Sequence, residues 1–154
     1  MQLSEFLDFD AIKTAVPAGN KRSLLQQLTN LAAPRVGADG AAILASVTER
    51  EQLGSTGFGQ GVAIPHGKVD GLGRIYCLFA RLSEPVDYKA IDGRPVDLVF
   101  LLLSPPDAGA EHLKALAAIS RVTRHVPTLE KMRGARSRDA LAAVLLGADE
   151  RDAA

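Results

Sequence analysis

The 154-residue chain contains a single cysteine, Cys77, and carries no net charge. One cysteine excludes an internal disulfide and any Cys-x-x-Cys metal site. Its position within an apolar run, Ile75–Ala80, predicts a buried and unreactive thiol. Lysine and arginine number 18, as do aspartate and glutamate, so no overall field favours nucleic acid or an acidic polymer as a partner.

Long apolar stretches and a leader segment are also missing. No apolar run approaches the ~20 residues of a membrane-spanning helix, and no basic and then apolar segment opens the chain. The sequence therefore predicts a cytoplasmic protein that is not embedded in a membrane. With no internal repeat or low-complexity linker, we expect a single domain over residues 1–147 and a flexible C-terminal tail over 148–154.

The order of the apolar patterns predicts the fold class. We expect strands over 11–16, 62–65, 74–82, 85–90 and 96–103, and helices over about 24–32, 41–52, 110–124, 128–133 and 137–146. Asn20 and Asp39 are placed to begin the first two helices. The strand over 96–103 is nearly all apolar, which is typical of a central strand covered on both faces. This order predicts an α/β fold, a three-layer sandwich in which helices flank a mixed sheet.

A glycine-rich run, Gly54–Lys68, holds the most informative histidine. The apolar strand before it stops at Pro65, and Gly67 follows His66, so that proline and glycine shape the backbone on both sides. Binding clefts of α/β sheets lie at such strand ends. An imidazole of ordinary pKa is mostly neutral near pH 7 and can accept a phosphoryl group as a nucleophile. His66 is therefore the candidate acceptor, with a purely structural role as the alternative.

The glycines of this run fit neither familiar nucleotide-binding template. A Walker A loop ends in Gly-Lys-Ser/Thr, which is absent here. The dinucleotide fingerprint follows a strand, whereas Gly57, Gly59 and Gly61 follow a helix and have another spacing. A simple chain reversal is one reading of these glycines. Ser55 and Thr56 either cap the loop or donate hydrogen bonds to phosphoryl oxygens.

Two further residues are candidates for holding an anion. His112 lies in the first turn of a predicted helix, where exposed N–H groups and the helix dipole favour negative charge. Arg50 ends the helix before the glycine run and carries a planar, permanently charged guanidinium. The alternatives are a packing role for His112 and a surface ion pair for Arg50. The sequence has no His-x-x-x-His pair and no Gly-x-Ser-x-Gly elbow, so it predicts neither a metal site nor a serine hydrolase.

Together these motifs resemble the signature of the enzyme IIA domains of the phosphotransferase system, of the fructose–mannitol type. The resemblance covers almost the whole chain. It is carried by Arg50-Glu51, Ser55-Thr56-Gly57, Gly61–Gly67, Pro95–Pro105 and Glu111-His112-Leu113. Within that family the chain is most similar to the stand-alone, nitrogen-related regulatory branch. We expect one domain without a fused enzyme IIB, and the segment Ala108–Leu116 resembles that branch.

The resemblance implies a phosphotransferase component without metal or cofactor. His66 would accept a phosphoryl group on Nε2 from a phosphohistidine of an HPr-like carrier, with His112 and Arg50 beside the phosphate. The phosphoryl-binding loop would comprise Ser55, Thr56, Gly57, Gly59, Gly61 and Gly67. Target proteins, such as potassium-transport or sensor-kinase systems, would read the phosphorylation state. The alternatives are a sugar-specific enzyme IIA that passes the group to a IIB domain, and a non-enzymatic anion-binding module.

Overall fold

The computed structural model describes the backbone of residues 1–153 and the side chains of residues 1–148. The strands are β1 (Lys13–Val16), β2 (Gly57–Gly59), β3 (Val62–Ala63), β4 (His66–Lys68), β5 (Tyr76–Val86) and β6 (Val96–Ser104). The helices are α1 (Lys21–Val36), α2 (Gly40–Gln52), α3 (Ala110–Thr123), α4 (Val126–Gly134) and α5 (Arg138–Ala153). Two short 3-10 turns, Leu3–Glu5 and Phe9–Ala11, precede β1. Within this described part of the chain, no helix is long and apolar enough to cross a membrane.

β6 lies at the centre of one mixed, open sheet with the strand order β1-β5-β6-β3-β2, and β4 also pairs with β6. β6 is antiparallel to β5 and parallel to β3 and β4. Every residue of β6 except Asp97 is buried. This confirms the prediction of a central strand covered on both faces, which the nearly continuous apolar run had indicated.

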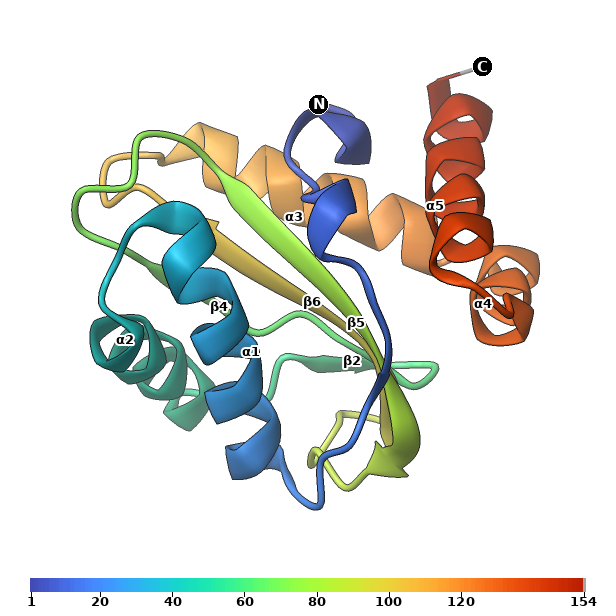
Figure 1. The fold of residues 1–154 in the computed structure, drawn as a ribbon, viewed down its shortest axis with the longest axis horizontal. Coiled ribbons are helices and arrows are strands. Elements are labelled where there is room, and N and C mark those ends of the chain that lie inside the picture. Colours follow the sequence, from blue (N-terminus) through green and yellow to red (C-terminus); the bar gives the residue numbers. More distant parts are fainter. Residues whose placement is uncertain (154) are drawn as a thin grey trace.

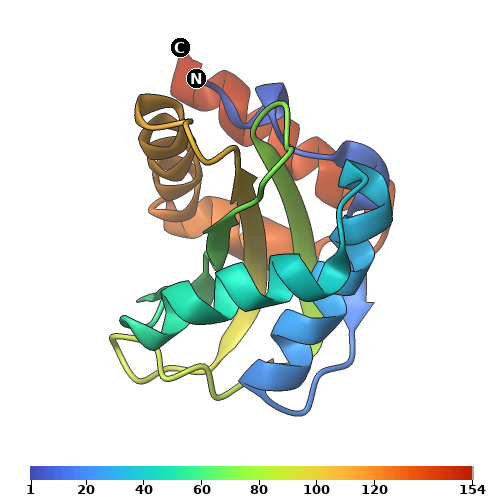
Figure 2. The same cartoon turned by 90° about the vertical axis from the view of Figure 1, so that its left-hand side faces the viewer.

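Side chains of β5 and β6 alternate between two hydrophobic cores because successive residues of a strand point to opposite faces. Phe79 and Phe100 pack with α3, α4 and α5 on one face. Leu78 and Leu101 pack with α1 and α2 on the other. Figures 1 and 2 show these two helical layers with the strands between them. The three-layer α/β sandwich is therefore confirmed.

The first two helices begin at the predicted caps. The Asn20 side chain accepts a hydrogen bond from the Ser23 N–H at 2.8 Å, and the Asp39 side chain accepts one from the Ala41 N–H at 3.3 Å. Gly37 ends α1 with φ +69°, a left-handed conformation in which glycine has no side-chain penalty. Gly37 and Asp39 together fix where α1 ends and α2 starts, and so they set which residues of α2 reach the end of the sheet that carries His66.

The structure corrects the predicted strand over 85–90. β5 continues from Tyr76 to Val86, past Pro85, and residues 87–90 form no strand. The register with β6 shifts between Arg81 and Val86. Irregular pairing tolerates proline, which lacks the N–H that a regular ladder would use. Pro85 therefore marks an irregularity within one strand, not the start of another.

The structure also corrects the setting of His66. The segment predicted as a loop contains β2, which turns back at Gln60 and Gly61 to pair with β3; both residues have positive φ, at 61° and 77°. His66 does not simply follow a strand, because it begins β4 after the break at Pro65.

At the C-terminus, α5 continues through Ala153, so most of the predicted tail over 148–154 has helical backbone. Ala154 and the side chains beyond 148 lie outside the described residues. The domain limit at 147 and the flexibility of the tail stay predictions.

Candidate functional site

An open pocket of about 410 Å³ brings together the two histidines singled out in the sequence. It lies where the C-terminal half of α2 meets β4 and the first turn of α3. Its lining residues are Ser46, Glu49, Arg50, Leu53, His66, Gly67, Lys68 and His112. Of the predicted site residues, the structure therefore gathers Arg50, His66, Gly67 and His112 around one space.

Pairing with the central strand positions His66. It stands opposite Leu102 in the parallel register of β4 and β6, and the Leu102 N–H donates to the Pro65 carbonyl oxygen at 2.9 Å. Gly67 lets α2 lie directly on β4, because a Cβ there would stand 2.7 Å from the Ser46 hydroxyl oxygen. As a result, His66 is buried, with 8% of its surface exposed, yet it still lines the pocket.

One hydrogen bond decides which ring nitrogen of His66 is free. Its Nδ1 lies 2.8 Å from the Ile64 carbonyl oxygen. A carbonyl oxygen can only accept, so Nδ1 carries the proton and the neutral ring keeps its lone pair on Nε2. Burial, with the charge of Arg50, lowers the pKa of His66 against the opposing effects of the Ile64 hydrogen bond and Glu51. The geometry therefore presents Nε2 as a nucleophile near neutral pH.

His112 lies beside His66 and is held from behind. The centroids of the two rings are 5.2 Å apart, and the ring planes are inclined at 55°. The Ser104 hydroxyl oxygen lies 2.6 Å from His112 Nδ1. Burial lowers the pKa of His112, and His66 and Lys68 lower it further. Two imidazoles with lowered pKa values therefore face the same space.

The charged groups of the pocket include two cations and one carboxylate. The Arg50 guanidinium donates to the Gly54 carbonyl oxygen at 2.9 Å, which holds the arginine side chain against the end of α2. Lys68 lies on the β4 side and Glu49 on the exposed side of α2. The balance of charge beside the imidazoles is therefore positive, which favours an anionic group.

The predicted loop residues lie elsewhere, apart from Gly67. Ser55, Thr56, Gly57, Gly59 and Gly61 are not among the residues that line the pocket. The Ser55 hydroxyl donates to the Tyr88 carbonyl oxygen at 3.3 Å, and Thr56 is fully buried. The three glycines allow close packing instead, against Ala90, Asp92 and the Arg133–Asp97 pair respectively.

Behind the pocket, a buried cluster surrounds Glu51, the residue after Arg50. The Glu51 carboxylate accepts from the Thr56 N–H at 3.2 Å, from the Thr56 hydroxyl, and from the Tyr88 hydroxyl at 2.8 Å. It also pairs with Lys21 Nζ at 2.7 Å, and that ammonium lies 4.2 Å from the centroid of the Tyr88 ring. This cluster ties the end of α2, the start of α1 and the segment before β2 together.

Sequence reasoning missed several residues around the site. Ser46, Lys68 and Ser104 belong to this group, and of these only Lys68 lies within the glycine-rich run that holds His66. Glu51 did leave a signal, because Ile43, Val47 and Glu51 follow one another at intervals of four, and all three are buried. A carboxylate on an otherwise apolar helical stripe indicates a buried partner.

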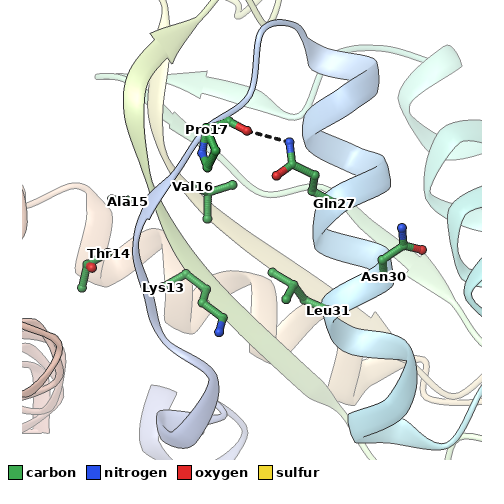
Figure 3. A pocket seen from close by; sticks show the side chains of 8 residues that line it. All are labelled: Lys13, Thr14, Ala15, Val16, Pro17, Gln27, Asn30 and Leu31. Carbon is green, nitrogen blue, oxygen red and sulfur yellow. Dashed lines mark hydrogen bonds between the residues drawn. The ribbon is translucent and has the colours of Figure 1, made fainter.

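Another hollow, of about 500 Å³, lies between β1 and α1 (Figure 3). Its lining residues are Lys13, Thr14, Ala15, Val16, Pro17, Gln27, Asn30 and Leu31. Gln27 closes one end by donating to the Pro17 carbonyl oxygen at 2.7 Å. These residues include no imidazole, thiol or carboxylate.

Across the described residues, no group of three or more His, Cys, Asp or Glu side chains is placed to hold a metal ion. We therefore place the candidate site in the pocket of His66.

Comparisons with known proteins identify the family of the chain. The family described as "Phosphoenolpyruvate-dependent sugar phosphotransferase system, EIIA 2" matches residues 5–147. A nitrogen regulatory protein of Bradyrhizobium diazoefficiens is 45% identical over 94% of this chain and 95% of its own length. A fructose-specific EIIA component of Haloferax volcanii is 35% identical over 93% of this chain and 94% of its own length. The crystal structure of nitrogen regulatory protein IIA-Ntr from Neisseria meningitidis superposes with a TM-score of 0.87 at 34% identity, covering 93% of this chain and 98% of the other.

Proposed function

Because the chain belongs to the EIIA 2 family of the phosphoenolpyruvate-dependent sugar phosphotransferase system, we propose that it is a regulatory enzyme IIA. In this role His66 receives a phosphoryl group from a phosphohistidine on an HPr-like carrier protein. The observation that carries the proposal is the hydrogen bond between His66 Nδ1 and the Ile64 carbonyl oxygen. It leaves Nε2 unprotonated, next to a second imidazole and two cations.

The transfer is a displacement at phosphorus between two ring nitrogens. His66 Nε2 forms the new P–N bond as the bond to the carrier's ring nitrogen breaks, and the electron pair of that broken bond returns to the carrier's imidazole. The Nδ1 proton of His66 stays on the ring, where the Ile64 carbonyl oxygen stabilises the positive charge that develops. The donor is already a reactive phosphoramidate, so positioning and electrostatic stabilisation supply the catalysis.

The neighbours of His66 stabilise the phosphoryl oxygens. His112 donates one hydrogen bond, and Arg50 and Lys68 supply positive charge where negative charge is concentrated. The contact predicted for Ser55, Thr56 and the loop glycines stays a prediction. Their contacts favour an indirect role, in which Thr56 fixes Glu51 and thereby the end of α2 that carries Arg50.

Docking of the carrier and of target proteins uses the rim of the same pocket. Leu53 lines it and is 83% exposed, and Leu113, next to His112, is 66% exposed. Phosphorylation adds a charge of about −2 at neutral pH, by analogy with phosphoserine. On a chain of zero net charge, this is a large local change that a partner can distinguish. The family resemblance suggests potassium-transport or sensor-kinase systems as the targets.

A second candidate function rests on the fructose-specific relative, which is 35% identical. Under this second function, the chain is a sugar-specific enzyme IIA that passes the phosphoryl group from His66 to an enzyme IIB domain. Addition of purified IIB separates the two functions: rapid transfer of the label to IIB indicates sugar uptake, whereas retention of the label favours regulation. Saturable anion binding without any covalent phosphate would instead indicate a binding module.

The proposal is tested by phosphorylation in vitro. The chain is incubated with phosphoenolpyruvate, the upstream kinase and the carrier, and the product is expected to hold an acid-labile, base-stable phosphate. His66→Ala should lose the label completely. His125→Gln is the matched control, because His125 hydrogen-bonds Thr128 at the start of α4 and does not line the pocket. Label that persists in His66→Ala would contradict the proposal.

A further inference from the structure

A buried serine contacts the second imidazole of the pocket. Ser104 is the last residue of β6 and is fully buried. Its carbonyl oxygen accepts from the Val69 N–H at 2.9 Å, and its place opposite Lys68 in the β4–β6 register fixes its backbone. Its hydroxyl oxygen lies 2.6 Å from His112 Nδ1. The paired end of β6 thus holds the Ser104 hydroxyl against a ring nitrogen of His112, which lines the pocket.

The groups available to Ser104 and His112 decide which of the two donates this hydrogen bond. Among the described side chains, His112 Nδ1 is the partner of the Ser104 hydroxyl. If Nδ1–H donated to the oxygen, the hydroxyl's own proton would be buried without an acceptor, which is costly. If the hydroxyl donates to Nδ1, the hydroxyl proton has an acceptor and the Nδ1 lone pair has a donor. The second arrangement is therefore favoured.

We propose that Ser104 is a positioning residue that holds neutral His112 in the tautomer with its proton on Nε2. Nδ1 is occupied by the serine hydroxyl, so Nε2–H is the group that His112 offers to the pocket it lines. That N–H is a donor already in place when a phosphoryl group arrives on His66, whose ring centroid is 5.2 Å away. A donor that is fixed beforehand needs no reorganisation during the transfer.

This inference rests on the proposed function for its consequence, although not for its geometry. With the opposite tautomer, the Nε2 lone pair of His112 would face the phosphoryl oxygens and repel them. Ser104 thus decides whether the second histidine helps or hinders the transfer. The two histidines receive complementary protonation: the proton is on Nδ1 in His66 and on Nε2 in His112.

The tautomer can be read without any phosphoryl donor, by ¹⁵N NMR of the histidine rings in the full chain above the pKa of His112. We expect a protonated Nε2 and an unprotonated Nδ1 for His112 in the wild type. Ser104→Ala should give a mixture of tautomers at His112 and leave His66 unchanged. A protonated Nδ1 at His112 of the wild type would overturn the proposal, whether or not the variant folds.

The rate of phosphoryl transfer gives the second readout. Ser104→Ala is expected to slow transfer from the phosphorylated carrier by about tenfold, the effect of losing one oriented hydrogen bond. Thr123→Ala is the matched control, because it also removes a hydroxyl, one that donates to the Ile119 carbonyl oxygen at the far end of α3. A wild-type rate in Ser104→Ala would overturn the positioning role. Failure of the wild type to become phosphorylated would instead reject the proposed function and leave the tautomer result standing.

Discussion

The two imidazoles of the pocket are held by different kinds of group. The Ile64 carbonyl oxygen can only accept, so it takes the Nδ1 proton of His66 and leaves a nucleophile on Nε2. The Ser104 hydroxyl can donate, and in our proposal it does so to His112, whose other nitrogen then carries the proton. In the proposed transfer, one ring attacks phosphorus while the other donates to its oxygens, and each role follows from one backbone or side-chain partner.

Both imidazoles also link stability to pH. Burial lowers the pKa of His66 and of His112, so at mildly acidic pH each binds a proton more readily in the unfolded chain than in the folded one. The stabilisation that comes from these two neutral imidazoles is therefore fully present above their ordinary pKa of about 6.5. It is lost as the pH falls through that value toward the pKa values of the folded protein. Arg50 and Lys68 act in the same direction, whereas Glu51 opposes the shift of His66.

We predict that the free energy of unfolding decreases between about pH 7 and pH 5. The double variant His66→Asn/His112→Asn should show a flatter profile over this window, because the groups that titrate differently are gone. Urea denaturation at a series of pH values measures this. Parallel profiles for the two proteins would show that the histidines are not the groups responsible.

At the scale of single residues, the sequence indicated the histidines and the arginine of the pocket better than the residues that hold them. His66, Arg50 and His112 stand out because their residue types suit an anion and neighbouring motifs mark them. Ser104 does not stand out, because its role depends on the pairing of β4 with β6 and on where α3 begins. Thr56 was predicted either to cap the loop or to donate to phosphoryl oxygens, and in the structure it hydrogen-bonds the buried carboxylate of Glu51. Contacts with distant segments decide both cases, because the Tyr88 hydroxyl hydrogen-bonds both Thr56 and Glu51.

At the scale of elements, the site depends on how α2 lies on β4. Gly67 allows this approach because a Cβ there would stand 2.7 Å from Ser46 Oγ and 3.1 Å from the Val47 nitrogen. Helix backbone cannot retreat as a flexible side chain can. Arg50, one turn further along α2, would move with the helix.

We predict that Gly67→Ala destabilises the fold by about 1–3 kcal/mol through overpacking. It should also slow phosphorylation of His66, because α2 and β4 both line the pocket. Gly73→Ala is a matched control, since a Cβ there meets nothing within 4 Å. Thermal denaturation and the phosphorylation assay test both variants. Equal stability of the two would show that the α2–β4 contact adapts without cost.

The buried cluster around Glu51 gives α2 a second anchor. Its carboxylate joins Lys21 of α1, Thr56 and Tyr88, and burial, together with the charge of Glu51, raises the pKa of Tyr88. A buried carboxylate needs such partners to stay charged. The cluster thus gives the C-terminal end of α2 a second contact, and Arg50 lies in the sequence between Glu51 and the residues Ser46 and Val47 that pack on Gly67.

The elements themselves could largely be predicted from periodicity and caps. The three longest helical patterns and the apolar central strand gave clear signals, and Asn20 and Asp39 marked two helix starts. The three-residue strands β2 and β4 did not, because so short a segment has no measurable alternation and Gly57, Gly59 and Gly67 carry no side chains. Pro85 was misread as a boundary, since sequence alone does not show that the pairing there is irregular.

At the scale of the whole molecule, the chain combines zero net charge with a local excess of positive charge at one pocket. The two cores on opposite faces of the sheet meet along β5 and β6, so the end of the sheet that carries His66 is supported from both sides. In the proposed function, phosphorylation changes the charge of this pocket, and partners can distinguish the two states without a change of fold.

The central claim is that His66 accepts the phosphoryl group on Nε2. The most direct test is NMR of the ¹⁵N-labelled chain after phosphorylation by the carrier, with detection of the coupling between ³¹P and the ring nitrogens. The account predicts coupling to Nε2 of His66, while Nδ1 of the same ring keeps its proton and its hydrogen bond to the Ile64 carbonyl oxygen. Phosphorus on Nδ1 of His66, or on His112, would contradict it.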